Sequence, residues 1–211
     1  MIICGTDLSE SSAATARVAG SIAQALGRPL LLVHVVSDAP RGTLESRLGA
    51  QADDLRLRFD IAVEARLERG APDERLVALA DELQAQLLVV SALGDRRQHR
   101  WLLGSVAERV AQASPVPVLV VRDGGRLEAW ARGQGALRVM VGVELTPASQ
   151  VALRWARGLR AIGPCELLVT YVAWPPAEHR RLDATSPVPL DRLGPGLEDT
   201  LLRALEEWAG E

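Results

Sequence analysis

Two glycines and a hydroxyl stand between two apolar runs in the middle of the chain, and these residue types can hold a phosphate. Gly94 and Gly104 are separated by nine residues, and Ser105 follows where the pattern VAERVAQA predicts a helix. Glycine lets the backbone approach an oxyanion, and the amides and positive dipole end at a helix start attract negative charge. The same spacing is typical of a strand-to-helix loop with Ser105 as the N-cap. Both interpretations stay open on spacing alone.

Other polar residues are also candidates for this chemistry. Arg96, Arg97 and Arg100 lie in the same loop, and guanidinium groups suit phosphate oxygens, although we favour three solvated side chains. Asp7 follows the first apolar run, where open parallel sheets place their ligand crevice; its alternative role is to cap the first helix. His34 is interpreted as a strand residue with a satisfied ring rather than a catalytic base.

Composition excludes several classes of function. The chain has 211 residues, 48% of them apolar, and a net charge of −3, so we expect a globular protein that binds neither nucleic acid nor an anionic membrane. All 24 basic residues are arginines, which excludes a Walker A lysine and Schiff-base chemistry. Three scattered histidines and two cysteines indicate neither a metal site nor a disulfide framework. Since no apolar run is long enough to span a bilayer and the N-terminus shows no leader pattern, we expect a cytoplasmic protein.

The elements that would position these residues alternate along the chain. Apolar runs predict five strands, and helical periodicity predicts four helices between them, the first capped by Ser9 and ended by Gly27. The predicted strands are residues 2–6, 29–36, 61–68, 86–90 and 116–121. The predicted helices are residues 9–27, 42–57 and 105–113, together with a helix after the turn at 70–72 that carries Leu76, Leu79, Ala80 and Leu83 on one face. This order predicts an α/β fold with a doubly wound, mostly parallel five-stranded sheet.

A partial second copy follows. Residues 123–136 are rich in glycine and are interpreted as a linker. Residues 139–146, VMVGVELT, then match residues 2–9, IICGTDLS, at a constant offset of 137. The segment 137–211 contains about half of the first unit, with a last helix near 196–209 and no counterpart of the glycine loop.

These residues resemble the universal stress protein family in a tandem form with a shortened second module. The resemblance covers residues 1–122, and its specific part is LLVVSALG together with LLGSVAERVAQASPVPVLVV. The family motif is glycine, two residues, glycine, nine residues, glycine and a serine or threonine. Gly94, Gly104 and Ser105 fit this motif, whereas Ser91 replaces its first glycine. The implied fold is that of the adenine-nucleotide α-hydrolase-like proteins.

The resemblance implies a site for ATP or another adenine nucleotide, with Mg as a possible companion of its phosphates. Asp7 would face the adenosine and Val35 the adenine ring. The remaining implied binding residues are Thr6, Ser91, Gly94, Gly104, Ser105 and Val106. The family further implies a homodimer through the edge strand Val116 to Val121, and a stress-response role exercised through an unknown regulatory protein partner.

Two alternatives remain. The first is a dimerisation or interaction module of the same fold that does not bind nucleotide, which is favoured by Ser91 and the shortened repeat. The second is a slow ATP hydrolase, for which the sequence offers no catalytic residue that we can name. Neither an SGGxDS loop, nor an HxGH motif, nor a GxSxG elbow is present.

Overall fold

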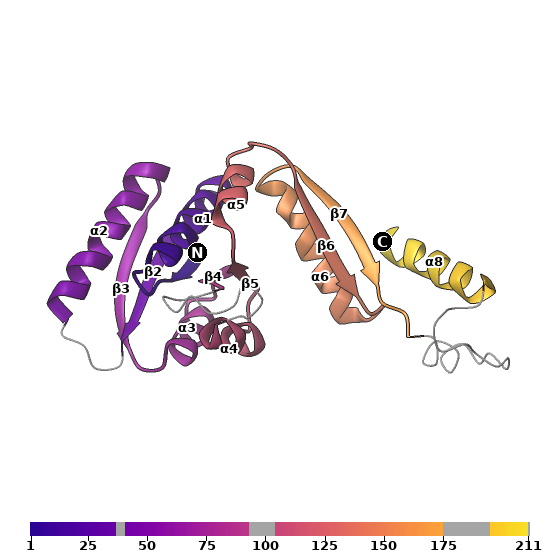
Figure 1. Ribbon diagram of the computed structural model, residues 1–211, viewed down its shortest axis with the longest axis horizontal. Coiled ribbons are helices and arrows are strands. Elements are labelled where there is room, and N and C mark those ends of the chain that lie inside the picture. Colours follow the sequence, from indigo (N-terminus) through magenta and orange to yellow (C-terminus); the bar gives the residue numbers. More distant parts are fainter. Residues whose placement is uncertain (37–40, 93–103, 175–194, 211) are drawn as a thin grey trace. The chain divides into compact units, whose positions relative to one another are not determined.

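The computed structural model describes residues 1–36, 41–92, 104–174 and 195–210 (Figure 1). The chain divides into two compact units, one formed by Met1–Gly135 with Ala161–Gly163 and the other by Ala136–Arg160 with Pro164–Glu211. No helix within the described ranges is both long and apolar enough to cross a membrane.

The first unit is a five-stranded sheet in which every neighbouring pair is parallel, with strand order β3-β2-β1-β4-β5. Its strands are β1 (Ile2–Gly5), β2 (Leu30–Val36), β3 (Val63–Arg69), β4 (Leu87–Ser91) and β5 (Val118–Val121). Its helices are α1 (Glu10–Leu26), α2 (Arg41–Phe59), α3 (Pro72–Glu82), α4 (Ser105–Ala113) and α5 (Gly124–Ala131). The predicted doubly wound α/β fold is confirmed.

Two helical layers cover this sheet. Helices α1, α2 and α5 pack together on one face, while α3 and α4 pack together on the other (Figure 1). The strands at the centre are apolar on both faces, as a sheet buried between two helical layers requires. On the α3 and α4 face, Ile3, Leu31, Val33 and Leu88 form one buried cluster with side chains of these helices.

Helix α1 begins and ends as its sequence predicts. The Ser9 side chain caps the helix by accepting a hydrogen bond from the Ser12 amide, and Gly27 ends it in the left-handed conformation with φ of 60°. Glycine adopts that conformation without the steric cost that a side chain would bring.

From the sequence, the stretch 123–136 is interpreted as a linker because of its glycines. In the structure, residues 124–131 of this stretch form helix α5, which packs against α1. Asp123 caps α5 by accepting from the Gly125 amide, so Gly124 and Gly125 lie at a helix start. A Cβ on Gly124 would lie 3.2 Å from the Ala14 carbonyl oxygen, which explains the close approach of the two helices. Tertiary packing therefore overrides the weak helical propensity of the segment.

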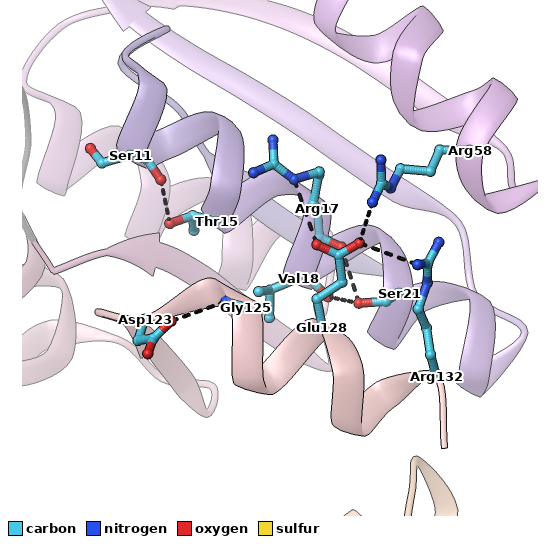
Figure 2. Close-up of polar contacts among 10 residues, drawn as sticks. All are labelled: Ser11, Thr15, Arg17, Val18, Ser21, Arg58, Asp123, Gly125, Glu128 and Arg132. Carbon is cyan, nitrogen blue, oxygen red and sulfur yellow. Dashed lines mark hydrogen bonds and ion pairs between the residues drawn. The ribbon is translucent and has the colours of Figure 1, made fainter. Parts of the chain in front are cut away.

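Glu128 of α5 is the polar centre of this packing (Figure 2). Its carboxylate lies 3.6 Å from Arg17 Nε, 2.7 Å from Arg58 Nη2 and 3.7 Å from Arg132 Nη1. These arginines come from α1, α2 and the end of α5, and the Glu128 side chain is only 14% exposed. One carboxylate thus links three helical segments across the outer face of the layer.

We expect Glu128→Gln to lower the free energy of unfolding by about 1–2 kcal/mol, because three guanidinium groups lose their shared anion. Urea unfolding at low and high salt measures this loss, which should shrink as salt screens the charges. The matched control is Asp54→Asn, an exposed acid on α2 that should change stability by less than about 0.5 kcal/mol. Equal effects of the two substitutions would contradict the linking role of Glu128.

The second unit repeats the first strand, helix and strand. Strands β6 (Leu137–Val143) and β7 (Cys165–Tyr171) are parallel, and α6 (Pro147–Gly158) and α8 (Pro195–Gly210) complete the unit. The 3-10 turn η1 (Leu159–Ala161) follows α6 in the chain. Leu8 and Leu145, which correspond at the offset of 137, have positive φ values of 62° and 56°. Ser9 and Thr146 cap their helices in the same way, each accepting from the amide three residues later. The local geometry of the two segments therefore agrees with the sequence repeat.

Candidate functional site

The candidate site lies at the carboxyl edge of the first unit's sheet, where the strand order reverses. From β1 the chain proceeds to β2 and β3 on one side, and then places β4 and β5 on the other. In open parallel sheets such a reversal leaves a crevice between the two neighbouring strands, here β1 and β4, beyond their carboxyl ends.

Strand register brings the predicted residues to this edge. Gly5 pairs with Val33 and Cys4 with Val89, so Asp7 and Ser91 follow on either side of the reversal. The Thr6 amide extends the pairing by donating to the Val33 carbonyl oxygen over 2.9 Å.

Asp7 is exposed beyond β1, and its Oδ1 accepts a hydrogen bond of 3.0 Å from the Ser9 amide. It is not the helix cap, since the Ser9 hydroxyl has that role. Burial raises the pKa of the Asp7 carboxyl, but hydrogen bonds from Ser9 and Ser12 outweigh it and hold this pKa below its ordinary value. Asp7 therefore carries a full negative charge at neutral pH and presents acceptor oxygens only.

Thr6, next to Asp7, is buried, and its hydroxyl is used within the protein. It donates to Gln51 Oε1 over 3.1 Å, accepts from the Leu8 amide over 3.1 Å and lies 3.0 Å from Ser12 Oγ. Thr6 thus supports the loop that carries Asp7.

Val35 and Ser91 line the neighbouring strand ends. Val35 is partly buried against the cluster on the α3 and α4 face, as an apolar wall would be. Ser91 is the last residue of β4 and pairs with Val121. In the described part of the chain the non-glycine residues with positive φ are Leu8, Asp60, Gln84 and Leu145, so a serine at position 91 needs no strained backbone.

Helix α4 begins on the β4 side of the crevice. Gly104 is its N-cap, with φ of −64°, and the Gly104 amide donates to the Ala92 carbonyl oxygen over 2.8 Å. The next three amides, of Ser105, Val106 and Ala107, have no intrahelical acceptor because of their position in the first turn. Together with the helix dipole they favour an anion. Gly94, Arg96, Arg97 and Arg100 lie outside the described residues.

His34 lies on the face of β2 opposite to that of Val33 and Val35. It alternates with Val33 and Val35 along β2, and its Nδ1 lies 2.7 Å from the Thr6 carbonyl oxygen. A carbonyl only accepts, so Nδ1 must carry the hydrogen. The interpretation of His34 as a strand residue with a satisfied ring agrees with this bond.

Residues 1–122 match the model of the Universal stress protein family, which is more than half of the chain. The chain belongs to the universal stress protein family. Similar proteins include a universal stress protein of Methanocaldococcus jannaschii, 29% identical over 137 residues, with 57% of this chain and 81% of the relative covered. Another, of Thermus aquaticus, is 29% identical over 133 residues and covers 57% of this chain and 97% of the relative.

Solved structures of other universal stress proteins show the same fold. One, a universal stress protein in complex with cAMP, is 36% identical with a TM-score of 0.51, covering 57% of this chain and 94% of that chain. Another, from Lactobacillus plantarum, is 20% identical with a TM-score of 0.53, covering 58% of this chain and 97% of that chain, and supports the fold alone.

The structure of this universal stress protein also contains contacts that the sequence did not indicate. Arg47 and Gln51 of α2 bond to the β1–α1 loop beside Asp7. They lie 39 and 45 residues from their partners, and no local pattern could identify them.

Proposed function

We propose that this universal stress protein binds an adenine nucleotide between the carboxyl ends of β1 and β4. The observation that carries the proposal is the opposite electrostatic character of the two sides of the crevice. Asp7 on the β1 side is an ionised acceptor, while the start of α4 on the β4 side offers amides and a positive dipole end. A nucleotide has the matching polarity, with donors on its sugar and base and negative charge on its phosphates.

This polarity fixes the orientation of the ligand in the proposal. Phosphates would be repelled by Asp7 and attracted to the amides of Ser105 and Val106. The sugar hydroxyls or the adenine amino group would donate to Asp7, and Val35 would contact the base. Thr6 would act by supporting Asp7, and the glycine loop with Gly94, Gly104 and Ser91 would surround the phosphates.

The 36%-identical universal stress protein with cAMP supports an adenine ligand, and we extend the proposal to ATP. The described residues contain no group of three or more His, Cys, Asp or Glu that could hold a metal ion. Magnesium would therefore enter as a companion of the phosphates.

The proposal for the whole chain assigns the site to a domain at 1–122 and a partial second module to 137–211. Strand β5 lies at the edge of the first unit's sheet, and we propose that two copies pair through Val116 to Val121. The protein would act in the cytoplasm in a stress response, through a regulatory protein partner. An interaction module that binds no nucleotide is the competing function, and its support is the pairing potential of this open edge.

Thermal unfolding with a ligand panel tests the proposal. We expect millimolar ATP, cAMP or AMP to raise the melting temperature, because a ligand that binds only the folded state stabilises it by about 2.7 kcal/mol at 100 times its Kd. GTP should raise it less. Asp7→Asn should reduce the shift, and Asp54→Asn should leave it unchanged. If no adenine nucleotide shifts the melting temperature and none is released from the purified protein on denaturation, the proposed nucleotide binding is wrong.

A further inference from the structure

Two side chains of α2 reach across to the loop that carries Asp7. Arg47 Nη2 donates to the Leu8 carbonyl oxygen over 3.0 Å, and Gln51 Oε1 accepts from the Thr6 hydroxyl over 3.1 Å. The two are four residues apart on α2 and therefore lie on the same face of the helix. Asp7 stands between their two partners in the chain.

The backbone of this loop is strained at the residue that follows Asp7. Leu8 has a φ of 62°, a conformation that costs a residue with a side chain about 1–2 kcal/mol. The Leu8 amide donates to the Thr6 hydroxyl, and the same hydroxyl donates to Gln51. Arg47 holds the Leu8 carbonyl on the other side of the residue. Contacts to α2 thus reach the residues on both sides of Asp7.

The second unit shows that this arrangement is not a requirement of the fold. Its equivalent loop has Leu145 at a φ of 56°, yet Val143 replaces Thr6 and offers no hydroxyl. There the Glu144 amide donates to Ser149 Oγ over 2.9 Å instead. The hydroxyl contact to α2 accompanies the unit that has the glycine loop.

We propose that Arg47 and Gln51 are positioning residues that hold Asp7 in the orientation in which it accepts from the nucleoside. This inference rests on the proposed function, and it gives helix α2 a role in nucleotide binding. Neither residue needs to touch the ligand. A displacement of α2 would break the bonds from Gln51 to Thr6 and from Arg47 to Leu8, and Asp7 between them would then turn more freely. We therefore expect the position of α2 to change the affinity for the nucleoside.

Arg47→Met and Gln51→Leu test the proposal, with Arg58→Met as the matched control. Arg58 is also an arginine of α2, but it bonds to Glu128 and not to the loop. We expect Arg47→Met and Gln51→Leu each to raise the Kd for ATP and cAMP about tenfold in isothermal titration calorimetry. A change of this size corresponds to the loss of one hydrogen bond, here the bond from the ligand to a correctly oriented Asp7. Arg58→Met should lower stability and leave both affinities unchanged.

A second measurement needs no ligand. Hydrogen exchange of the Leu8 and Ser9 amides should accelerate about tenfold in Arg47→Met and Gln51→Leu, and remain unchanged in Arg58→Met. The pKa of Asp7, followed by carboxyl NMR, should rise toward its ordinary value in the same two variants, because the Ser9 amide no longer stays in place. Gln51→Glu keeps an acceptor oxygen for the Thr6 hydroxyl, so the Leu8 and Ser9 amides of this variant should exchange as slowly as in the wild type.

The outcomes separate the two proposals. Unchanged exchange at Leu8 and Ser9 in both variants would overturn the positioning role, whatever the nucleotide result. Accelerated exchange with unchanged affinity would overturn it as well. Absence of nucleotide binding by the wild-type chain would overturn the proposed function and, with it, the role of α2 toward a nucleoside.

Discussion

Ser105→Asp is expected to weaken ATP binding at least about 100-fold while leaving the fold as stable as the wild type or slightly more stable. The new carboxylate would lie at the first position of α4, where the proposal places a phosphate, and two anions about 4 Å apart repel by several kcal/mol near a protein surface. The same carboxylate suits a helix N-terminus and stabilises it by up to about 1 kcal/mol. Binding and stability should therefore change in opposite directions, as titration calorimetry and urea unfolding would show.

Ser105→Ala provides the control for charge. It removes the hydroxyl without adding an anion, so affinity should fall less than about tenfold. If Ser105→Asp binds ATP as tightly as Ser105→Ala, the phosphate does not lie at the start of α4. A loss confined to ATP, with adenosine bound as before, would support the proposed orientation.

Phe59→Ala should have the largest effect on stability, lowering the free energy of unfolding of the first unit by about 4 kcal/mol. Phe59 is fully buried at the end of α2. A Cβ on Gly20 would lie 2.5 Å from its ring, so the ring fills the space left by that glycine. The guanidinium carbons of Arg58 and Arg132 each lie 5.7 Å from the ring centroid, and this contact would also be lost.

Leu57→Ala is the control for this core substitution. Leu57 belongs to the same turn of α2 but is 89% exposed, so its loss should cost less than about 0.5 kcal/mol. Urea unfolding followed by circular dichroism measures both. Similar costs for the two variants would contradict the role of Phe59 as a buried contact between α2 and Gly20 of α1.

Much of the first unit could be predicted because its signals are local. The helix predicted at 105–113 is α4, Ser105–Ala113, and Gly27 ends α1 as predicted. Apolar runs, caps and helical periods each need only neighbouring residues. The parallel order then follows from alternation of strands and helices, and it places Asp7 and Ser91 at one edge of the sheet.

The residues 123–136 show where local reasoning fails. Glycine content favours a linker, but Gly124 instead permits α5 to approach the Ala14 carbonyl, and Glu128 then meets arginines of α1 and α2. Arg58 and Glu128 are 70 residues apart. Their pairing depends on which helices lie on the same face of the sheet, and this is a property of the whole topology.

The candidate site divides in the same way. By itself, the sequence determined the strand and helix order, the acidic residue after the first strand, and the hydroxyl at a helix start. Only the tertiary structure decided that Thr6 supports the loop through Gln51, that Arg47 holds the strained Leu8, and that Ser91 lies in extended backbone. Periodicity depends on neighbours in the chain, whereas hydrogen-bond partners depend on neighbours in space, which only the packing of α2 against the loop brings together.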